Sequence, residues 1–427
     1  MHHFSYRDGT LHCEDVPLAT IAAAVGTPVY VYSTATLRRH WGVFTGALAE
    51  AGLDTSVHFA TKANGNRAVL RTLADLGAGA DVVSGGELYA ALHAGIPASR
   101  IVFSGVGKTR DDLAYALDQG IFQINVESEP ELRLLDAVAR EKGVKAPIAI
   151  RVNPDVEAGT HEKITTGKLD NKFGIAWTQA HALYRLAAGL EGIEVKAIAM
   201  HIGSQIADLA PFAAAFRRMR DLLAILRADG IAIERLDIGG GLGVPYDREG
   251  DPTPMPPADY AKVIRQELGD LGCKILLEPG RLITANAGVL LTRVIYRKEG
   301  ATRTFLIVDA GMNDLVRPAM YDAFHDIATV TEPAAGSDRE LVDVVGPICE
   351  SSDIFAKQRA LPRLEADDLL VLRTAGAYGA AMSNSYNGRP LVPEVLVNGD
   401  QYAVVRRRPT WEEMVALEDL APWQRGG

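Results

Sequence analysis

Lys62 is the first residue whose type and position suit covalent chemistry. It lies in the run FATKAN at residues 59–64, directly after a stretch typical of a buried strand, so a strand end would deliver its amine. A partly buried lysine near other cations loses its proton readily and can form a Schiff base with a carbonyl compound. A lysine in such a position, taken alone, is more often a surface lysine on a loop, so the other polar residues must decide.

Two glycine-containing runs suit the binding of an anion. Residues 239–243 read GGGLG and residues 278–281 read EPGR, and each run follows an apolar stretch. Glycines let backbone N–H groups approach an anion closely, and the loops after strands 7 and 8 of an α/β barrel commonly hold phosphate. One such run is more often a simple turn, but two in these positions predict a phosphate site.

His201, Ser204 and Glu278 could hold the flat ring of a cofactor. The His201 ring could stack on a heteroaromatic ring, and Ser204 could donate a hydrogen bond to phosphate. Glu278 would end a buried strand, where a carboxylate needs a cationic partner. The protonated ring nitrogen of pyridoxal phosphate is such a partner, and this pairing keeps the ring an electron sink. The alternatives are a hydrogen-bonded histidine at a strand end and an ion pair of Glu278 with Arg281.

The C-terminal third could contribute an acid, a carboxylate clamp and a tight turn. Cys349 could donate a proton, and the anion Glu350 beside it favours the protonated thiol. Arg317 and Tyr321 would lie one turn apart on a helix, where the guanidinium could bind a carboxylate with two parallel hydrogen bonds. Tyr378 lies in a GAYG turn. The structural alternatives are a small buried thiol, a surface arginine with a core tyrosine, and a packed turn.

The composition indicates a globular protein with more than one core. The chain has 427 residues, too many for one ordinary core, and its 48% hydrophobic content excludes disorder. The net charge is −10 without a long basic run, which disfavours nucleic acid as a partner and favours a small charged metabolite. Three cysteines predict reduced thiols and a cytoplasmic location, and we expect neither a secretory signal nor a membrane span.

The region between residues 57 and 278 predicts a TIM barrel. Short apolar runs alternate with stretches whose apolar residues recur at i, i+3, i+4 and i+7, as in a parallel sheet covered by helices. The expected strands are residues 57–61, 80–83, 101–103, 122–125, 148–152, 197–201, 236–238 and 275–278. The expected helices are residues 68–76, 86–94, 109–119, 130–142, 178–188, 212–228 and 257–269. A doubly wound sheet is the alternative, but the polar residues follow strand ends, where a barrel forms its active site.

The flanks of this region predict a second, mostly antiparallel β domain. Its expected strands are residues 289–296, 304–308, 341–345, 368–372, 394–397 and 402–406, with 28–32 as an addition. We therefore expect a barrel domain at residues 34–285 and a β-sandwich or barrel-like domain built from residues 1–33 and 286–427. Residues 411–427 would form a fraying helix, and the Gly and Thr content of residues 153–172 predicts a mobile loop.

In combination, these motifs resemble the diaminopimelate decarboxylases, a group within the alanine-racemase-like (fold type III) pyridoxal-phosphate enzymes. The resemblance extends from about Phe4 to Val405, and no motif position departs from it. The matching motifs are FATKAN (59–64), HIGSQ (201–205), GGGLG (239–243), EPGR (278–281), RPAMY (317–321), CESSD (349–353) and GAYG (376–379), with further matches at 151–154, at 172–174 and around Arg389 and Glu394.

The resemblance implies a role for each of these positions. Lys62 holds pyridoxal phosphate through a Schiff base, His201 stacks on its ring, and Glu278 pairs with its ring nitrogen. The implied phosphate-binding residues are Ser204, Gly240, Gly241, Gly280, Arg281 and Tyr378. The implied substrate-binding residues are Arg281, Arg317, Tyr321, Glu350 and Tyr378. Cys349 is the implied catalytic acid, and it enters with Glu350 from the partner subunit of a homodimer with two shared sites.

The implied reaction is the decarboxylation of meso-diaminopimelate to L-lysine and CO₂, the last step of lysine biosynthesis. Ornithine and arginine lack the distal carboxylate of this substrate, so two arginines (Arg281, Arg317) with Glu350 favour diaminopimelate. The resemblance also separates this chain from racemases of the same fold, which place an arginine against the ring nitrogen. An ornithine- or arginine-type decarboxylase remains an alternative, as does a non-catalytic decarboxylase-like regulatory protein, although the retained lysine and cysteine argue against the latter.

Overall fold

The computed structural model describes residues 2–156 and 172–425. The chain forms two compact units, which we describe separately. The barrel unit comprises Leu37–Pro245 and Glu249–Thr284, and the β unit comprises Met1–Thr36, Tyr246–Arg248 and Ala285–Gly427. Most of the predicted loop at residues 153–172 lies outside the described residues.

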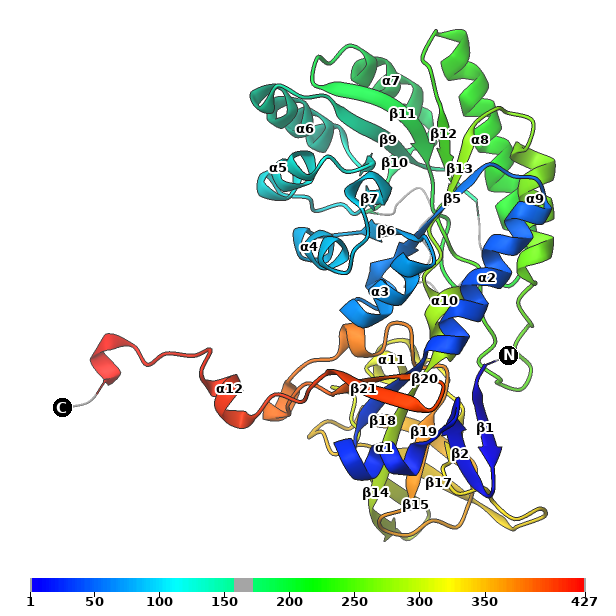
Figure 1. Cartoon of the computed structure of the whole chain (residues 1–427), viewed down its shortest axis with the longest axis vertical. Coiled ribbons are helices and arrows are strands. Elements are labelled where there is room, and N and C mark those ends of the chain that lie inside the picture. Colours follow the sequence, from blue (N-terminus) through cyan, green and yellow to red (C-terminus); the bar gives the residue numbers. More distant parts are fainter. Residues whose placement is uncertain (1, 157–171, 426–427) are drawn as a thin grey trace. The chain divides into compact units, whose positions relative to one another are not determined.

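In the described part of the barrel unit, eight parallel strands close into a barrel (Figure 1). The pairing order is β5, β6, β7, β8, β9, β11, β12, β13 and back to β5. The strands are β5 (Thr55–Ala60), β6 (Gly79–Val82), β7 (Ile101–Phe103), β8 (Gln123–Val126), β9 (Ala146–Asn153), β11 (Ile193–Ala199), β12 (Arg235–Asp237) and β13 (Lys274–Leu277), and the short β10 (Ile175–Ala176) pairs with β9. The predicted barrel is confirmed, and each predicted strand overlaps an observed one.

The barrel helices begin and end at local sequence signals. The side chains of Ser84, Thr109 and Ser128 accept hydrogen bonds from backbone N–H groups of the first turn of α4, α5 and α6. Gly120 and Gly143 end α5 and α6 in the left-handed conformation that glycine adopts without strain. The helices of this unit, which surround the strands in Figure 1, are α2 (Thr34–Glu50), α3 (Arg67–Asp75), α4 (Gly85–His93), α5 (Arg110–Gln119), α6 (Glu129–Lys142), α7 (Trp177–Ala188), α8 (Ala210–Ala228), α9 (Pro257–Leu268) and α10 (Arg281–Thr284).

The β unit contains a mixed but mostly antiparallel sheet, as predicted. Its strand order is β18-β17-β15-β14-β4-β20-β21, with β19 pairing to β14 and β16, and a small sheet β1-β2-β3 lies apart from this order. Only the β15–β17 and β4–β20 pairs are parallel among the described strands of this sheet. Its elements are β1 (Phe4–Arg7), β2 (Thr10–Cys13), β3 (Val16–Pro17), α1 (Leu18–Val25), β4 (Val29–Ser33), β14 (Gly288–Glu299), β15 (Thr304–Val308), α11 (Arg317–Tyr321), β16 (Ile327–Thr329), β17 (Arg339–Val345), β18 (Ile354–Pro362), β19 (Leu369–Leu372), β20 (Glu394–Asn398), β21 (Gln401–Arg406) and α12 (Trp411–Val415).

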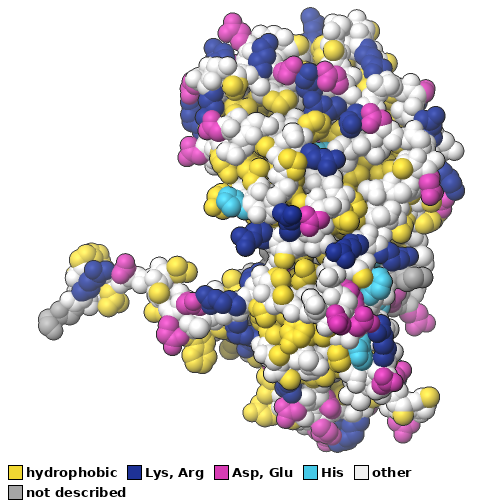
Figure 2. Space-filling model, viewed as in Figure 1, with side chains coloured by type: hydrophobic (Ala, Val, Ile, Leu, Met, Phe, Trp, Pro, Cys, Tyr) yellow, Lys and Arg dark blue, Asp and Glu magenta, His cyan; other side chains and the backbone are white. Residues whose placement is uncertain are grey.

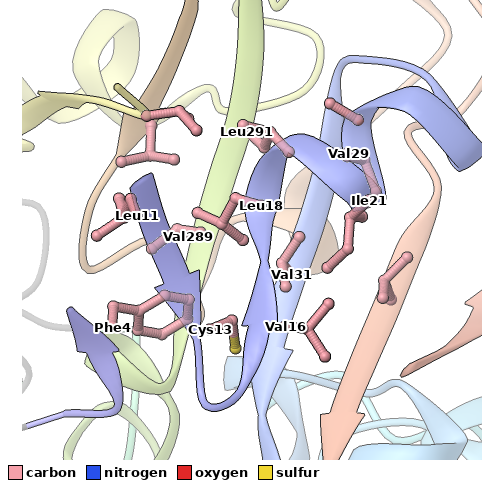
Figure 3. Close-up of a cluster of buried hydrophobic side chains, with 14 of the residues drawn as sticks. Phe4, Leu11, Cys13, Val16, Leu18, Ile21, Val29, Val31, Val289 and Leu291 are labelled. Atoms are coloured by element: carbon pink, nitrogen blue, oxygen red, sulfur yellow. The ribbon is translucent and has the colours of Figure 1, made fainter. Parts of the chain in front are cut away.

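Strand β4 contributes both faces to the interior of the β unit. Val29 and Val31 join a cluster of buried apolar side chains from β1, β2, α1 and β14 (Figure 3). Tyr30 and Tyr32 alternate with them, and their hydroxyls donate to the Asp314 carbonyl at 2.7 Å and to a carboxylate of β20 at 2.5 Å. This alternation is the two-residue period of a strand, and here both of its faces are buried.

Several elements of the β unit were not predicted from sequence. Strand β18 was missed because its sequence, IFAKQRALP, places charged side chains among the apolar ones, and exposed positions occur within it. The first three strands and α1 were also missed, as was α2 at the start of the barrel unit. The predicted C-terminal helix is confined to α12 and a short 3-10 turn at Pro422–Gln424.

The surface carries charges of both signs. Figure 2 shows basic and acidic side chains interspersed on the face that it draws. Among the described residues, no helix is both long and apolar enough to cross a membrane. Cys13, Cys273 and Cys349 are free cysteines.

Candidate active site

Lys62 lies just past the end of β5, on a short 3-10 turn (Thr61–Ala63). Its Nζ forms an ion pair with Asp81 Oδ2 at 2.8 Å, and Asp81 is fully buried in β6. The β5–β6 register pairs Ala60 with Asp81, so strand pairing brings the two charges within reach. The sequence predicted an amine among cations, whereas the structure places a carboxylate against it. That carboxylate orients the amine and favours its charged form.

The second carboxylate oxygen of Asp81 has no hydrogen-bond donor beside it in the described part of the chain. This oxygen, Oδ1, is also buried. Buried polar atoms are nearly always paired, so an orphaned acceptor in a site points to a ligand or water that completes it.

A pair of acids, Asp237 and Glu278, lies at the end of β12 and directly after β13. Asp237 and Glu278 are hydrogen-bonded to each other, and the Asn125 side-chain amide donates to Asp237 Oδ2 at 3.0 Å and to Glu278 Oε1 at 3.4 Å. Burial raises the pKa of Glu278 well above its usual range, and the charges of Asp237 and Asp81 raise it further. Burial also raises the pKa of Asp237 to about 6. The cluster therefore holds more acid than Lys62 alone can neutralise, and it favours a cationic ligand.

His201 follows β11 and is held in one protonation state. Its Nδ1 accepts a hydrogen bond from the backbone N–H of Gly240 at 3.3 Å, which leaves the ring proton on Nε2. Burial lowers the pKa of His201 well below its usual range, and the charges of Arg151 and Lys62 lower it further. The ring is therefore uncharged at neutral pH, as suits a side chain that stacks on an aromatic ligand.

The two predicted glycine runs meet at the same end of the barrel. A Cβ on Gly240 would lie 2.3 Å from the Glu278 carbonyl oxygen, so only glycine fits there. Gly241 has a φ of 111°, which also favours glycine. The guanidinium of Arg281, at the start of α10, donates to Ser204 Oγ at 3.1 Å and 3.3 Å. A hydroxyl, a guanidinium and tightly packed glycines together suit a phosphate group.

Gly280 is also closely packed, although less tightly than Gly240. A Cβ at this position would meet the Cβ atoms of Ala63 and Ala60 at 3.0 Å and 3.1 Å. The loop after β13 is therefore packed directly against the turn that carries Lys62, which fixes the spacing between the amine and the predicted phosphate site.

In the β unit, Arg317 and Tyr321 share the single-turn helix α11. The Arg317 guanidinium lies 2.9 Å from His325 Nε2 and 5.0 Å from the centre of the Tyr246 ring. His325 donates its other ring N–H to the Arg373 carbonyl at 2.8 Å, so its Nε2 can accept from Arg317. These contacts fix the orientation of the guanidinium, and Arg317 is buried.

The remaining predicted residues lie on loops and a turn of the β unit. Cys349 and Glu350 follow β17 and are exposed, and Glu350 accepts a hydrogen bond from the Tyr386 hydroxyl at 2.7 Å. The structural alternative for Cys349, a small buried thiol, is therefore wrong, because Cys349 is exposed. Tyr378 has a φ of 55°, and a Cβ on the following Gly379 would lie 2.5 Å from a backbone oxygen, so this turn is tightly defined.

The structure thus brings together the predicted barrel residues, which are Lys62, His201, Ser204, Gly240, Gly241, Glu278, Gly280 and Arg281. The other predicted residues, Arg317, Tyr321, Cys349, Glu350 and Tyr378, belong to the β unit. Sequence reasoning missed Asp81, Asn125 and Asp237. Their signal was a polar side chain inside an otherwise apolar strand of a covered barrel, where such a residue needs a partner.

The described residues fit pyridoxal phosphate. The acid cluster with the orphaned Asp81 oxygen suits a cationic ring, and the Ser204–Arg281 pair beside the glycine run suits a phosphate. Residues 34–285 match the family model described as "Pyridoxal-dependent decarboxylase, pyridoxal binding domain". The fold and the site thus define a TIM-barrel decarboxylase that uses pyridoxal phosphate as its cofactor.

Comparison with known proteins shows which family of pyridoxal-phosphate decarboxylases the chain resembles. The chain is 49% identical over 421 residues to a diaminopimelate decarboxylase of Zymomonas mobilis, covering 98% of this chain and 99% of the relative. It is 50% identical to that of Pseudomonas aeruginosa, covering 99% and 100%. A solved diaminopimelate decarboxylase from M. jannaschii, in complex with L-lysine, has 36% identity and a TM-score of 0.92 and covers 99% of this chain and 100% of its own. The chain belongs to the diaminopimelate decarboxylase family.

Proposed function

We propose that the protein decarboxylates meso-diaminopimelate to L-lysine and CO₂, using pyridoxal phosphate. The observation that carries this proposal is the meeting of Lys62, Glu278 and the glycine run at one end of a barrel, in a chain similar to diaminopimelate decarboxylases along its whole length. Solved relatives from M. jannaschii and Helicobacter pylori bind L-lysine, the proposed product.

The barrel residues would hold and tune the cofactor. When bound, pyridoxal phosphate supplies an aromatic ring that accepts the electron pair left by the departing CO₂. The Lys62 amine bonds the cofactor covalently, and Asp81 orients that amine. Glu278 would pair with the ring nitrogen of the cofactor, and the uncharged His201 would pack against its ring. The phosphate would be bound by Ser204, Gly240, Gly241, Gly280 and Arg281 of the barrel unit and by Tyr378 of the β unit.

The substrate would be recognised by its distal amino acid group. Arg281, Arg317 and Tyr321 bind the distal carboxylate, and Glu350 binds the distal ammonium. Cys349 would be the acid that donates a proton to the substrate, because a thiol on an exposed loop can reach an incoming ligand. Charge thus selects diaminopimelate over ornithine and arginine, which lack the distal carboxylate.

The assembly and location remain part of the proposal. We propose a homodimer in which Cys349 and Glu350 of one subunit complete the site of the other, a barrel domain at residues 34–285, a second domain from residues 1–33 and 286–427, and a cytoplasmic location. The net charge of −10 supports a small charged substrate over nucleic acid.

One experiment separates this function from its alternatives. Purified protein with pyridoxal phosphate is incubated separately with meso-diaminopimelate, ornithine, arginine and D- or L-alanine. Release of CO₂ from meso-diaminopimelate alone supports the proposal. Release from ornithine or arginine would indicate a broader decarboxylase, interconversion of alanine would indicate a racemase, and no reaction with bound cofactor would indicate a regulatory protein.

A further inference from the structure

A short turn of the β unit contacts both of the residues that the second subunit is proposed to supply. In the 3-10 turn Tyr386–Gly388, the Tyr386 hydroxyl donates to Glu350 Oε1 at 2.7 Å. The side-chain oxygen of the next residue, Asn387, accepts from the Cys349 backbone N–H at 2.8 Å. Two adjacent residues of the turn therefore hold two adjacent residues of the loop after β17, one by its side chain and the other by its backbone.

The turn itself is fixed by its own hydrogen bonds. The Tyr386 backbone N–H donates to Asn384 Oδ1 at 3.0 Å, and the Asn384 backbone N–H donates to the Asn313 carbonyl at 2.9 Å. Asn387 has a φ of 57°, in the left-handed region that asparagine adopts more readily than most residues. Position 387 thus suits a residue that tolerates this backbone and carries a side-chain acceptor.

The loop that carries Cys349 and Glu350 is also anchored by a buried carboxylate. One oxygen of Asp353 accepts from the Ile348 N–H at 2.7 Å, and the other accepts from the Met312 N–H at 2.7 Å. Asp353 is 3% exposed, whereas Cys349 and Glu350 are exposed. Asp353 therefore fixes the buried part of the loop, and the 3-10 turn contacts its exposed part.

The two contacts of the turn control different properties of the loop. The hydrogen bond to Glu350 raises the pKa of Tyr386, so the phenol keeps its proton and remains a donor at neutral pH. This bond restricts the rotation of the Glu350 carboxylate, and a group that is oriented in advance loses less entropy when it binds a ligand. The contact of Asn387 instead fixes the backbone that carries the Cys349 thiol, and the rate of proton donation depends on the position of the acid.

We propose that Tyr386 and Asn387 are positioning residues: Tyr386 orients Glu350 toward the distal ammonium of the substrate, and Asn387 sets the position of the Cys349 thiol. The inference rests on the proposed function and on the proposed homodimer. Tyr386 therefore acts on substrate binding, whereas Asn387 acts on turnover. Both hydrogen bonds strengthen when the partner subunit excludes water from the loop.

Steady-state kinetics of CO₂ release from meso-diaminopimelate by the holoenzyme test this division. Tyr386→Phe removes only a hydroxyl, and it should raise KM about 3- to 10-fold, as expected for one lost hydrogen bond, and change kcat less than about twofold. Asn387→Gly removes the acceptor and tolerates the positive φ, and it should lower kcat at least about tenfold and change KM less than about twofold. A turn with a purely structural role would change kcat and KM together in both variants, and that result would overturn the inference.

Further variants serve as controls. Asn387→Asp keeps an acceptor oxygen at the same place and should recover most of kcat, so a loss as large as that of Asn387→Gly would overturn the role of Asn387. Tyr402→Phe is the matched control for Tyr386→Phe, because Tyr402 is 36% exposed and lies on β21 of the same unit. An equal rise of KM in Tyr402→Phe would overturn the role of Tyr386. If Asn387→Gly does not fold, Asn387→Ala removes the same acceptor and is measured in its place.

A double variant tests whether Tyr386 acts through Glu350. Adding Tyr386→Phe to Glu350→Ala should raise KM by less than about twofold, because the carboxylate that Tyr386 orients is already absent. Calorimetric titration of the holoenzyme with L-lysine, whose distal ammonium would meet Glu350, should show the same pattern in Kd. Losses that add in the double variant would overturn the inference.

Failure of the proposed function would be seen in the wild type itself, which would then release no CO₂ from meso-diaminopimelate, and the inference would fall with it. In a wild type that does release CO₂, an unchanged KM in Tyr386→Phe or an unchanged kcat in Asn387→Gly would overturn the inference alone.

Discussion

The close contact between Gly240 and Glu278 makes a strong prediction about Gly240→Ala. The added Cβ would lie 2.3 Å from the Glu278 carbonyl oxygen and 3.1 Å from its carbonyl carbon. Both atoms belong to the backbone, so no side-chain rotation relieves the clash. Ordinary contact begins near 3.4 Å, so the two loops must separate by about 1 Å.

The expected losses of stability and activity in Gly240→Ala follow from this displacement of about 1 Å. Overpacking of this kind costs about 1–3 kcal/mol of stability. The same movement carries the Glu278 carboxylate away from the ring nitrogen that it should contact, and a misplacement of about 1 Å at a reacting centre can lower the rate about 100-fold. We therefore expect Gly240→Ala to lower kcat/KM for CO₂ release by roughly 100-fold and to weaken the binding of pyridoxal phosphate.

Steady-state CO₂ release and cofactor titration would measure both effects. Gly107→Ala is the control, because a Cβ at that exposed glycine has no atom within 4 Å and its φ is not positive. A Gly240→Ala enzyme with kcat/KM within about twofold of the Gly107→Ala control would refute the packing argument, since the expected loss is far larger.

Three further predictions concern the proposed acid and the stability of the two units. Cys349→Ala should keep the visible absorbance of the bound cofactor but slow decarboxylation about 10²–10⁴-fold, and full activity would exclude the thiol as the acid. Burial raises the pKa of Asp314 to about 6, so its contribution to stability is present below about pH 4 and is lost as the pH rises through about 6. In urea unfolding, Asp314→Asn should therefore gain stability relative to wild type between about pH 4 and pH 7, and a constant difference would contradict this. Lys108→Met should cost about 3–5 kcal/mol, because it leaves the buried Glu131 carboxylate without its ion-pair partner at 2.8 Å. The exposed-pair control Lys142→Met should cost less than about 1 kcal/mol, and equal losses would refute the burial argument.

The barrel could be predicted from sequence because its strands are short apolar runs that end at polar residues. Residues 101–103 were predicted exactly as β7 occurs, since the run Ile-Val-Phe is bounded by clear turn signals. The positions of Lys62, His201 and Glu278 followed from the same logic, because the carboxyl ends of parallel strands meet at one end of a barrel. The resemblance to a known family then supplied the catalytic and cofactor-binding roles that we assigned to these residues.

Other features depend on contacts that sequence does not reveal. Asp81 and Asp237 lie within apolar runs, and only the folded structure shows that Asp81 contacts Lys62 and that Asp237 hydrogen-bonds to Glu278. The Lys62 amine meets the Asp81 carboxylate, where the sequence predicted surrounding cations, because the β5–β6 register pairs Ala60 with Asp81. Strand β18 was not predicted because its charged residues interrupt the alternation of apolar and polar residues that is typical of a strand. Its antiparallel pairing with β17 stabilises it as a strand.

The central claim is that the Lys62 amine is the covalent attachment point for pyridoxal phosphate. Borohydride reduction of the protein loaded with pyridoxal phosphate, followed by peptide mass mapping, tests this most directly. The account predicts one modified peptide, with the label on Lys62, and no label at this position in Lys62→Ala. A label on another lysine, or no label in wild-type protein that releases CO₂ from meso-diaminopimelate, would contradict it.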